Sequence, residues 1–429
     1  MINVLENKQC CGCGACVQVC PKECIIMVND TEGFSYPKVD HDRCIDCHLC
    51  EQVCPMLQFA KPADPQSVEA MRFQDKQKRI ESSSGGVFTA IAEEIIRRDG
   101  VVFGAAWTDD WQVEHRYCES IDGLAAFRGS KYVQSDTGCS YRQVRDFLRQ
   151  GRWVLFSGTP CQCRGLKLYL RKDYDKLVTI DFICHGVPSN KVFRAYLKEE
   201  IRNYVRKDVE KNSVLLHPIH QIPEPDALVP SGWRLKGIWF RDKRKGWKKY
   251  SFALALAEVS TDGEQNTVLL SPIFLNSSYM KGFGANIYLR PSCHNCPARS
   301  FSSGSDITLA DYWGIEEQHP EMDDDKGTSL VAVHTEKARK LLNDLNDSIE
   351  RKSVNATDAY KIQICLNRNM PINRYREEFW ASDYENDFSN VVNRICKRRT
   401  IGQRIINSIK FVLRTIGVKC VYKYIKKKL

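Results

Sequence analysis

The 429-residue sequence lacks the apolar segments that secretion or membrane insertion requires. Its first ten residues, MINVLENKQC, do not place an apolar stretch after a basic one, as a signal peptide does. No apolar run elsewhere reaches about 18 residues, roughly the minimum for a membrane-spanning helix. These absences predict a cytoplasmic protein.

The sequence also lacks the G-x-G-x-x-G motif that follows the first strand of many nucleotide-binding domains. If the protein binds a dinucleotide, the site is therefore expected to lie outside that fingerprint. No internal repeat is visible in the chain after the first 60 residues.

Acidic residues are missing from residues 389–429, which contain 12 Lys and Arg residues. The whole chain carries a net charge of +10, so residues 1–388 carry −2 and offer no general surface for nucleic acid. The tail is predicted to be a basic amphipathic helix, which either lies on an anionic membrane surface or packs on the body. Its apolar residues at helical spacing are Ile401, Ile405, Ile409, Val412 and Ile416.

Cysteine, by contrast, is abundant, with 20 residues. In a reducing compartment, cysteines indicate metal ligands or reactive thiols before disulfides. Two runs near the N-terminus read C-x2-C-x2-C-x3-C followed by proline, which is the bacterial ferredoxin signature. Paired zinc sites usually have wider separations, so zinc is the weaker alternative. Because the fourth cysteine of each run binds the other cluster, the predicted 4Fe-4S ligands are Cys10, Cys13, Cys16 and Cys54 for one cluster and Cys44, Cys47, Cys50 and Cys20 for the other.

The sequence predicts a mixed α/β, or α+β, architecture. Residues 1–60 are expected to form the two-cluster ferredoxin domain, with a hairpin around Asn29–Gly33, and residues 61–71 a linker. Residues 72–388 alternate helices and strands, with an antiparallel hairpin inserted within 232–259. Residues 389–429 form the predicted helical tail.

Cys293 and Cys296 have ligand spacing but cannot complete a metal site alone. Cys161 follows a strand and Pro160, so it is predicted to lie in a first helical turn, where the helix dipole lowers a thiol pKa. Cys184 ends the next apolar strand. A third cluster held by these four cysteines is the hypothesis, with Cys163 as a substitute for Cys161. The alternative is that Cys161 or Cys184 is a small buried apolar residue.

Six motifs in the same order resemble the family of coenzyme F420 hydrogenase/dehydrogenase beta subunits, which includes 7-hydroxymethyl chlorophyll a reductase. The resemblance covers roughly residues 70 to 320. It implies a non-Rossmann FAD domain with an iron–sulfur cluster close to the flavin. The motifs are SSSGGVFTAIAEEI, GSKYVQSDTG, VLFSGTPCQCRGL, DFICHGVPS, SCHNCPAR and SDITLADYWGIE.

The resemblance also implies roles for individual residues. Lys131 is placed beside the flavin N1–C2=O edge, or is an ordinary surface lysine, and His185 is a proton donor or a packed histidine. Asp306 and Asp311 either hydrogen-bond the cofactor or cap local turns. Backbone contact with the cofactor, and the turn that presents Cys161, are assigned to Ser83, Ser84, Gly85, Gly86, Gly158, Thr159 and Pro160.

The predicted function is that of an iron–sulfur flavoprotein oxidoreductase. Its 4Fe-4S clusters and FAD are expected to connect a redox partner, such as ferredoxin or another electron donor, with a small-molecule substrate. The sequence does not identify the substrate. Two alternatives remain open: an electron-transfer subunit that serves a separate catalytic partner, and a zinc-dependent scaffold.

Overall fold

The structure is a computed structural model that describes residue 2 and residues 9–212, 228–230, 232–260, 263–270 and 274–397. The apolar residues of the predicted tail helix, from Ile401 onward, lie outside the described residues, so the membrane contact stays a prediction. Within these ranges, no helix combines the length and the apolar character that crossing a bilayer requires.

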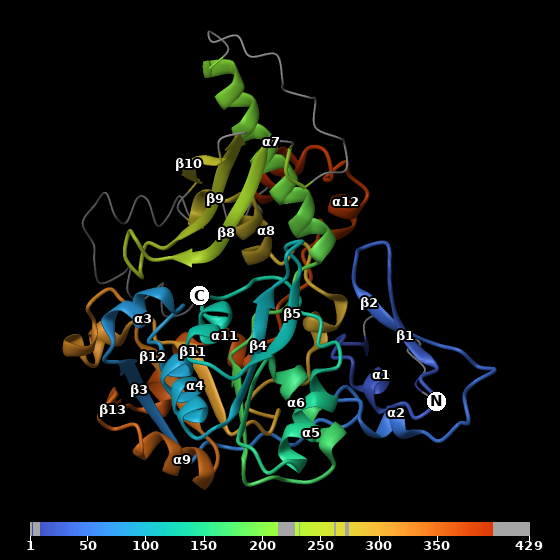
Figure 1. Cartoon of the computed structure of the whole chain (residues 1–429), viewed down its shortest axis with the longest axis vertical. Helices are drawn as coiled ribbons and strands as arrows, with labels where there is room; N and C mark the ends of the chain where they lie inside the picture. The colour runs from blue at the N-terminus through green and yellow to red at the C-terminus, as the bar shows by residue number, and fades with distance from the viewer. Residues whose placement is uncertain are drawn as a thin grey trace.

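The N-terminal module, which we call the ferredoxin module, contains a two-stranded antiparallel sheet in which Asn29 pairs with Ser35. Each cysteine run leads into a short helix after a residue with positive φ: Gly14 at 71° and His48 at 56°. The module lies beside the rest of the chain (Figure 1). Its elements are α1 (Ala15–Val19), β1 (Ile25–Asn29), β2 (Ser35–Val39) and α2 (Leu49–Gln52).

The rest of the chain, which we call the α/β body, is built on a mixed sheet of eight strands within the described residues, in the order β13-β3-β12-β11-β7-β6-β4-β5. The four strands β11, β7, β6 and β4 run parallel to one another, and the flanking strands pair antiparallel. The predicted mixed α/β class is confirmed. The strands are β3 (Ser67–Phe73), β4 (Val101–Trp107), β5 (Val113–Cys118), β6 (Val154–Ser157), β7 (Leu177–Phe182), β11 (Ile307–Asp311), β12 (Ser329–Val333) and β13 (Ile349–Ser353).

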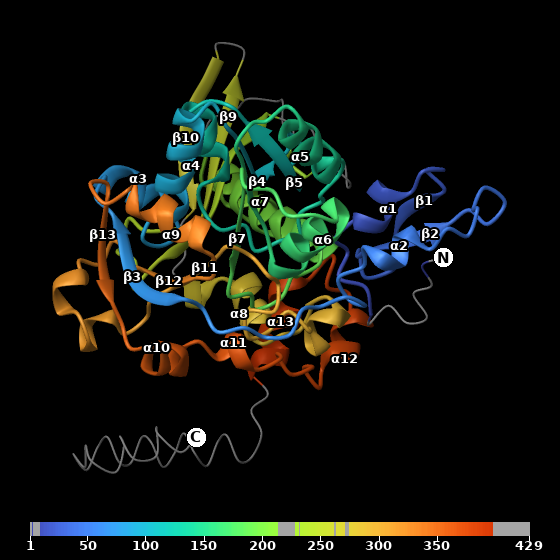
Figure 2. The ribbon, with the colours of Figure 1, turned by 90° about the horizontal axis from the view of Figure 1, so that it is seen from below.

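Helices cover both faces of this sheet because its strands are apolar on both sides. Helices α4 (Val87–Arg97) and α9 (Glu336–Asn343) share one buried apolar cluster with it. Helices α5 (Ser140–Arg149) and α6 (Pro160–Leu170) share another, which also includes Ala15 of the ferredoxin module. Figure 2 shows α5 and α6 on the side of the sheet that faces the module. Helix α6, which follows β6 and carries Cys161 in its first turn, therefore lies next to the ferredoxin module.

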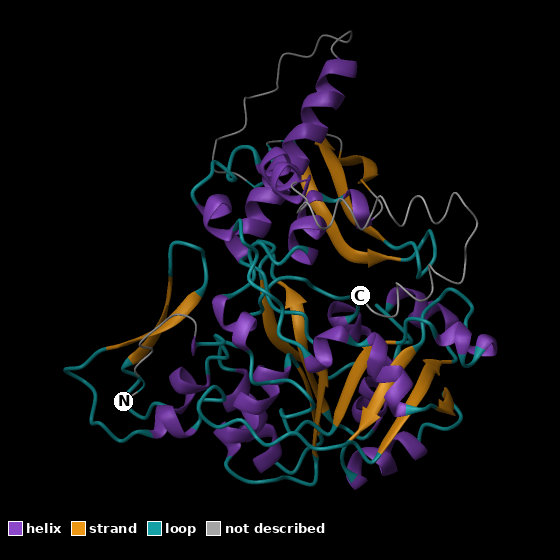
Figure 3. Cartoon of the chain, turned by 180° about the vertical axis from the view of Figure 1, so that it is seen from behind, coloured by secondary structure: helices purple, strands orange, loops and turns teal. Residues whose placement is uncertain are grey.

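A second layer lies above one end of the large sheet (Figure 3). Strands β8 (Trp233–Asp242) and β9 (Ser251–Ser260) form the predicted hairpin, and β10 (Gly263–Leu270) extends it. Helices α7 (Asn190–Asn212), α8 (Ser278–Gly284) and α13 (Phe388–Lys397) pack with this sheet around one apolar cluster. The remaining helices are α3 (Lys76–Glu81), α10 (Ala356–Ile362), α11 (Ile364–Asn367) and α12 (Arg376–Trp380).

Candidate iron–sulfur and cofactor site

The first cysteine group (Cys10, Cys13, Cys16 and Cys54) brings together the members predicted for one cluster. Burial raises the pKa of Cys16, and the neighbouring thiols Cys10 and Cys54 raise it further. A hydrogen bond with Cys11 lowers the pKa of Cys13, but burial and the thiols Cys16 and Cys54 raise it overall. Cys54, from the second run, therefore lies among the cysteines of the first run, as the crossed ligation pattern requires.

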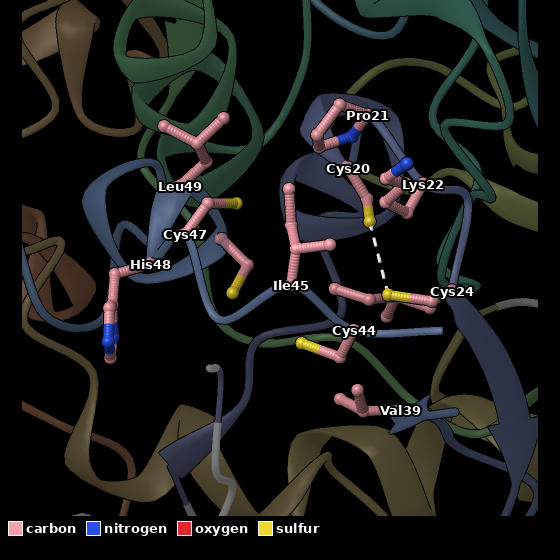
Figure 4. Close-up of a pocket in the computed structure, with 12 residues that line it drawn as sticks. Cys20, Pro21, Lys22, Cys24, Val39, Cys44, Ile45, Cys47, His48 and Leu49 are labelled. Carbon is pink, nitrogen blue, oxygen red and sulfur yellow. Dashed lines mark hydrogen bonds between the residues drawn. The ribbon is translucent and has the colours of Figure 1, made fainter. Parts of the chain in front are cut away.

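The second cysteine group (Cys20, Cys44, Cys47 and Cys50) lines a pocket together with Cys24. Figure 4 shows the sulfurs of Cys20, Cys24, Cys44 and Cys47 pointing into this space. The sulfurs of Cys20 and Cys24 are 3.4 Å apart, and burial raises the pKa of Cys24 to about 11, with Cys20 and Cys44 adding to the shift. The sequence indicated no role for Cys24, which the fold places beside a predicted ligand set.

The third cysteine group (Cys161, Cys184, Cys293 and Cys296) is assembled from separate segments. Cys161 lies in the first turn of α6, after Thr159, which caps the helix together with Gln162. Cys184 follows β7, and Cys293 lies in the 3-10 turn Pro291–Asn295. The pKa of Cys184 is raised well above its usual value, first by burial and then by the thiols of Cys293, Cys161 and Cys296.

Two details of the third group differ from the sequence arguments. The substitute Cys163 is fully buried, and its sulfur lies 3.5 Å from the carbonyl oxygen of Ile180 within the sheet. The expected lowering of the Cys161 pKa is wrong: a hydrogen bond with Cys11 and burial raise that pKa well above its usual value. The contact with Cys11, together with burial, thus outweighs the helix dipole. A buried thiol of this kind ionises when a metal binds it.

Within the described residues, no three His, Cys, Asp or Glu side chains are arranged to hold a single metal ion. A 4Fe-4S cluster presents four irons to four thiolates, so its ligands stand further apart than those of one zinc ion. Each of the three cysteine groups supplies four thiols, which is the donor set that a 4Fe-4S cluster requires.

The serine loop (residues 83–86) leads from α3 into α4 and packs against the start of β12. The Ser84 hydroxyl donates to the carbonyl oxygen of Thr328 at 3.0 Å, and the Gly85 N–H donates to Ser329 Oγ at 3.0 Å. A Cβ on Gly85 would lie 2.5 Å from the backbone oxygen of Met71. Only glycine fits there, and the N–H of Gly85 is already used within the protein.

Guanidinium groups with unused donors lie near the serine loop. Buried nitrogen atoms of Arg79, Arg128 and Arg241 lack a hydrogen-bond partner among the described residues. Their neighbours contact the loop directly: Ser130 Oγ donates to Ser83 Oγ at 2.7 Å, and Lys243 Nζ donates to the Ser84 carbonyl at 3.0 Å. Buried donors normally have acceptors. The unused donors therefore fit an anionic group, such as the phosphates of FAD, at this loop.

Lys131 lies between the serine loop and the turn that leads to the third cysteine group. Burial lowers its pKa to about 8, and its Nζ donates to the carbonyl oxygens of Arg128 and Gly129 at 3.3 and 3.4 Å. It lies within electrostatic range of His115, whose Nε2 is 3.0 Å from the carbonyl oxygen of Ser157. Ser157 precedes the Gly158–Thr159–Pro160 turn that presents Cys161.

His185 occupies a packed position next to Cys184. Its Nε2 lies 2.7 Å from Asn286 Oδ1, and its Nδ1 lies 3.6 Å from the sulfur of Cys365. The ring of Phe283 is 4.7 Å away, between centroids. Burial is the main cause of a lowered pKa for His185, so the neutral ring is favoured near neutral pH.

Asp306 and Asp311 lie at opposite ends of β11 and have protein partners. Asp306 is buried and accepts hydrogen bonds from the N–H and hydroxyl of Thr179, both at 2.8 Å, so it ties β11 to β7. Asp311 forms an ion pair with Arg241. Its other oxygen, Oδ1, has no hydrogen-bond partner among the described residues. Oδ1 of Asp311 can therefore still accept a hydrogen bond from a ligand, whereas the carboxylate of Asp306 is used to join β11 to β7.

A pocket also adjoins the third cysteine group. Burial raises the pKa of Asp181 in this pocket to about 6, so its carboxyl can exchange a proton near neutral pH. The residues that line the pocket are Pro160, Asp181, Phe182, Ile183, Cys184, Ala298, Phe301, Ser303, Thr308, Cys365 and Leu366.

Two parts of the chain match known protein families. The C-terminal part of the coenzyme F420 hydrogenase/dehydrogenase beta subunit matches residues 151–358. This region is therefore similar to that family. A 4Fe-4S dicluster domain matches residues 9–57. Both the resemblance carried by the six motifs and the prediction of a ferredoxin-type module are confirmed.

Individual proteins that resemble this chain share little sequence identity with it. One subunit of the F420H2 dehydrogenase of Methanosarcina mazei is 22% identical over 251 residues, which are 52% of this chain and 69% of the relative. A chain in a xenon-derivatized structure of the F420-reducing NiFe hydrogenase complex from Methanosarcina barkeri is 18% identical, with a TM-score of 0.41. That alignment covers 71% of this chain and 91% of the other.

The six family motifs did not include several residues that the fold brings to these sites. Cys11 contacts both Cys13 and Cys161 and so lies between the first and third groups. Arg241 and Lys243 come from the charged end of β8, which the sequence showed only as a hairpin turn. Arg290 precedes the Cys293 turn and is fully buried. The sequence signal that could have pointed to Arg290 was its position directly before Pro291 and the C-x2-C pair.

Proposed function

We propose that the protein is an iron–sulfur flavoprotein oxidoreductase with three 4Fe-4S clusters and FAD. The observation that carries this proposal is the convergence of Cys161, Cys184, Cys293 and Cys296 in a buried site beside the ferredoxin module. When bound, the clusters supply single-electron transfer and FAD supplies exchange between one and two electrons. The similarity to the beta-subunit family and the dicluster domain support the oxidoreductase class.

The residues of the α/β body have distinct roles in this proposal. The third cysteine group holds the cluster, and the Gly158–Thr159–Pro160 turn fixes Cys161 at the helix start. The serine loop and the unused nitrogen donors of Arg79, Arg128 and Arg241 bind the phosphates of FAD. Lys131 would supply a partly desolvated ammonium that stabilises negative charge on a bound flavin. His185 packs beside Cys184 in its neutral form, so its contacts with Asn286 and Cys365 favour a positioning role over that of a proton donor.

A second candidate function is an electron-transfer subunit that delivers electrons to a separate catalytic protein. The observation in its favour is that the relative from M. mazei is named as one subunit of F420H2 dehydrogenase. The fused dicluster domain argues the other way, because a chain with its own clusters depends less on a separate electron carrier. The two candidates share the clusters and differ in whether the chain alone can reduce a small molecule.

Anaerobic reduction and reoxidation of the isolated chain separates the candidates. We expect dithionite or reduced ferredoxin to bleach the flavin absorbance, and a small-molecule acceptor to restore it without another protein. Reoxidation that occurs only after a separate protein is added would assign the electron-transfer role. If the purified chain shows cluster absorbance but no flavin band, the flavoprotein proposal is wrong.

A further inference from the structure

Arg290 is a fully buried side chain that joins the α/β body to the ferredoxin module. Its Nε donates to the carbonyl oxygen of Cys10 at 2.6 Å, and its Nη2 donates to the carbonyl oxygen of Ser35 at 2.8 Å. Its Nη1 donates to Gln134 Oε1 at 2.9 Å. The guanidinium carbon lies 4.4 Å from the ring centroid of Tyr36. The side chain is therefore held from both sides of the interface.

The charge of Arg290 lacks a carboxylate partner. Its three acceptors are neutral oxygens, and no Asp or Glu in the described part of the chain forms an ion pair with it. A buried charge without compensation is costly. The strongest electrostatic interactions of Arg290 with ionisable groups are with Cys10, Tyr36, Cys11 and Cys293, in that order, and Cys161 also lies within electrostatic range. Burial raises the pKa of Tyr36, so the phenol stays neutral.

Two of these thiols belong to different cysteine groups: Cys10 to the first and Cys293 to the third. The same turn carries Arg290 and Cys293, because the Cys293 N–H donates to the Arg290 carbonyl at 2.9 Å. The Val187 N–H in turn lies 3.4 Å from the Cys293 sulfur, and the Arg290 N–H donates to the Val187 carbonyl at 2.8 Å. A movement of Arg290 therefore moves a ligand of the third group and the Cys10 loop together.

The loop of residues 10–13, which lies opposite Arg290, leaves the guanidinium little room to move. Gly12 has a φ of 70°, and a Cβ there would lie 2.7 Å from Arg290 Nη1. Gln134 Nε2 donates to the Cys11 carbonyl at 3.0 Å, and Thr137 Oγ1 donates to the Cys13 carbonyl at 2.9 Å. Side chains of the α/β body thus hold the carbonyls of Cys10, Cys11 and Cys13 in turn.

The second cysteine group has a different environment. Cys47 is exposed, and Ile45 beside it has 57% of its surface exposed. Burial is the first cause of the raised pKa of Cys50, a backbone hydrogen bond from Ile2 lowers it, and Glu51 is a further influence. Arg290 is not one of these influences. The first and third groups therefore each contain a thiol that interacts with Arg290, whereas no such interaction is found for Cys50 of the second group.

We propose that Arg290 is a positioning residue shared by the first and third clusters, which fixes the Cys10 loop against the Cys293 turn and raises the reduction potentials of both clusters. The proposal rests on the proposed function, since it requires three clusters. A reduced cluster carries one more negative charge than its oxidised form, so a nearby cation in a low-dielectric interior favours the reduced form. The second cluster is expected to be unaffected.

Redox titration followed by electron paramagnetic resonance, on the anaerobically reconstituted full chain, tests this proposal. In Arg290→Gln we expect unchanged iron content and more negative midpoint potentials for two of the three clusters. Arg290→Lys keeps the charge and should recover part of the shift. Gln134→Glu keeps Arg290 but places a carboxylate beside Nη1, so it should shift the same two potentials in the same direction.

The matched control is Arg142→Gln. Arg142 also binds the ferredoxin module, since its Nε donates to the Gln18 carbonyl at 2.9 Å, but among the described residues it forms no hydrogen bond with Cys10 or Cys293. Its three potentials should match those of the unaltered chain. Unchanged potentials in both Arg290→Gln and Gln134→Glu would overturn the proposal, as would an equal shift of all three clusters. If Arg290→Gln loses iron, Gln134→Glu decides alone. Fewer than three clusters in the unaltered chain would instead contradict the proposed function.

Discussion

Replacing Cys293 with serine is expected to lower the iron content of the anaerobically reconstituted chain from about twelve to about eight irons. Cys293 lies in the third cysteine group, and its pKa is raised to about 12, first by burial, with Cys296 and Cys161 among the neighbouring thiols. The first and second groups keep all their predicted ligands in this variant. Iron and sulfide analysis measures the loss, and the ferredoxin-type spectrum of the remaining clusters should persist.

Cys163→Ser provides the matched control, because it changes a buried thiol only two residues from Cys161. The Cys163 sulfur contacts backbone oxygens of Gly158 and Ile180. We expect this variant to retain about twelve irons. If Cys163→Ser loses one cluster and Cys161→Ser loses none, Cys163 rather than Cys161 is the ligand of the third cluster. Full iron content in Cys293→Ser would contradict the presence of a third cluster.

Replacing Asp306 with alanine is expected to destabilise the fold by about 3–5 kcal/mol, the usual cost of breaking a buried charge pair. Asp306 accepts from Thr179 and from the Thr335 hydroxyl at 2.9 Å, and Lys337 Nζ lies 3.4 Å away. Burial raises the pKa of Asp306, but Lys167, Lys337 and the Thr179 hydrogen bonds lower it overall. Its carboxylate form is therefore the one that holds β11 against β7. Urea unfolding under anaerobic conditions measures the effect.

The control for Asp306 is Asp344→Ala. Asp344 pairs with Arg98 at 2.7 Å, but 54% of its side chain is exposed. An exposed pair of this kind contributes at most about 1 kcal/mol. A small effect of Asp306→Ala combined with a large loss of bound flavin would contradict the structural role and support the cofactor role that the resemblance implied.

Features with strong local patterns could be predicted from the sequence. The two cysteine runs predicted the ferredoxin-type module because each ligand set is mostly contiguous in sequence. The apolar residues of Val87–Arg97 recur at helical spacing, so this helix is visible in the sequence, and in the structure those residues pack on the sheet. The hairpin β8–β9 followed from β-branched and aromatic residues on either side of a charged turn.

Other features depend on tertiary contacts that no local pattern encodes. Arg290 follows a short stretch of ordinary sequence, and its burial depends on a loop 280 positions earlier in the chain. The partner of Asp311 is Arg241, from an inserted hairpin. The pKa of Cys161 also could not be predicted, because the helix start suggested a lower value while contact with the distant Cys11 raises it. Contacts of this type become visible only when the module and the α/β body are placed together.

Measurement of iron, acid-labile sulfide and flavin on one anaerobically purified sample tests the central claim most directly. We expect about twelve irons and about twelve sulfides per chain, held by three cysteine groups of four, together with one FAD. About eight irons with no flavin would contradict it, because the α/β body would then hold neither the third cluster nor the cofactor.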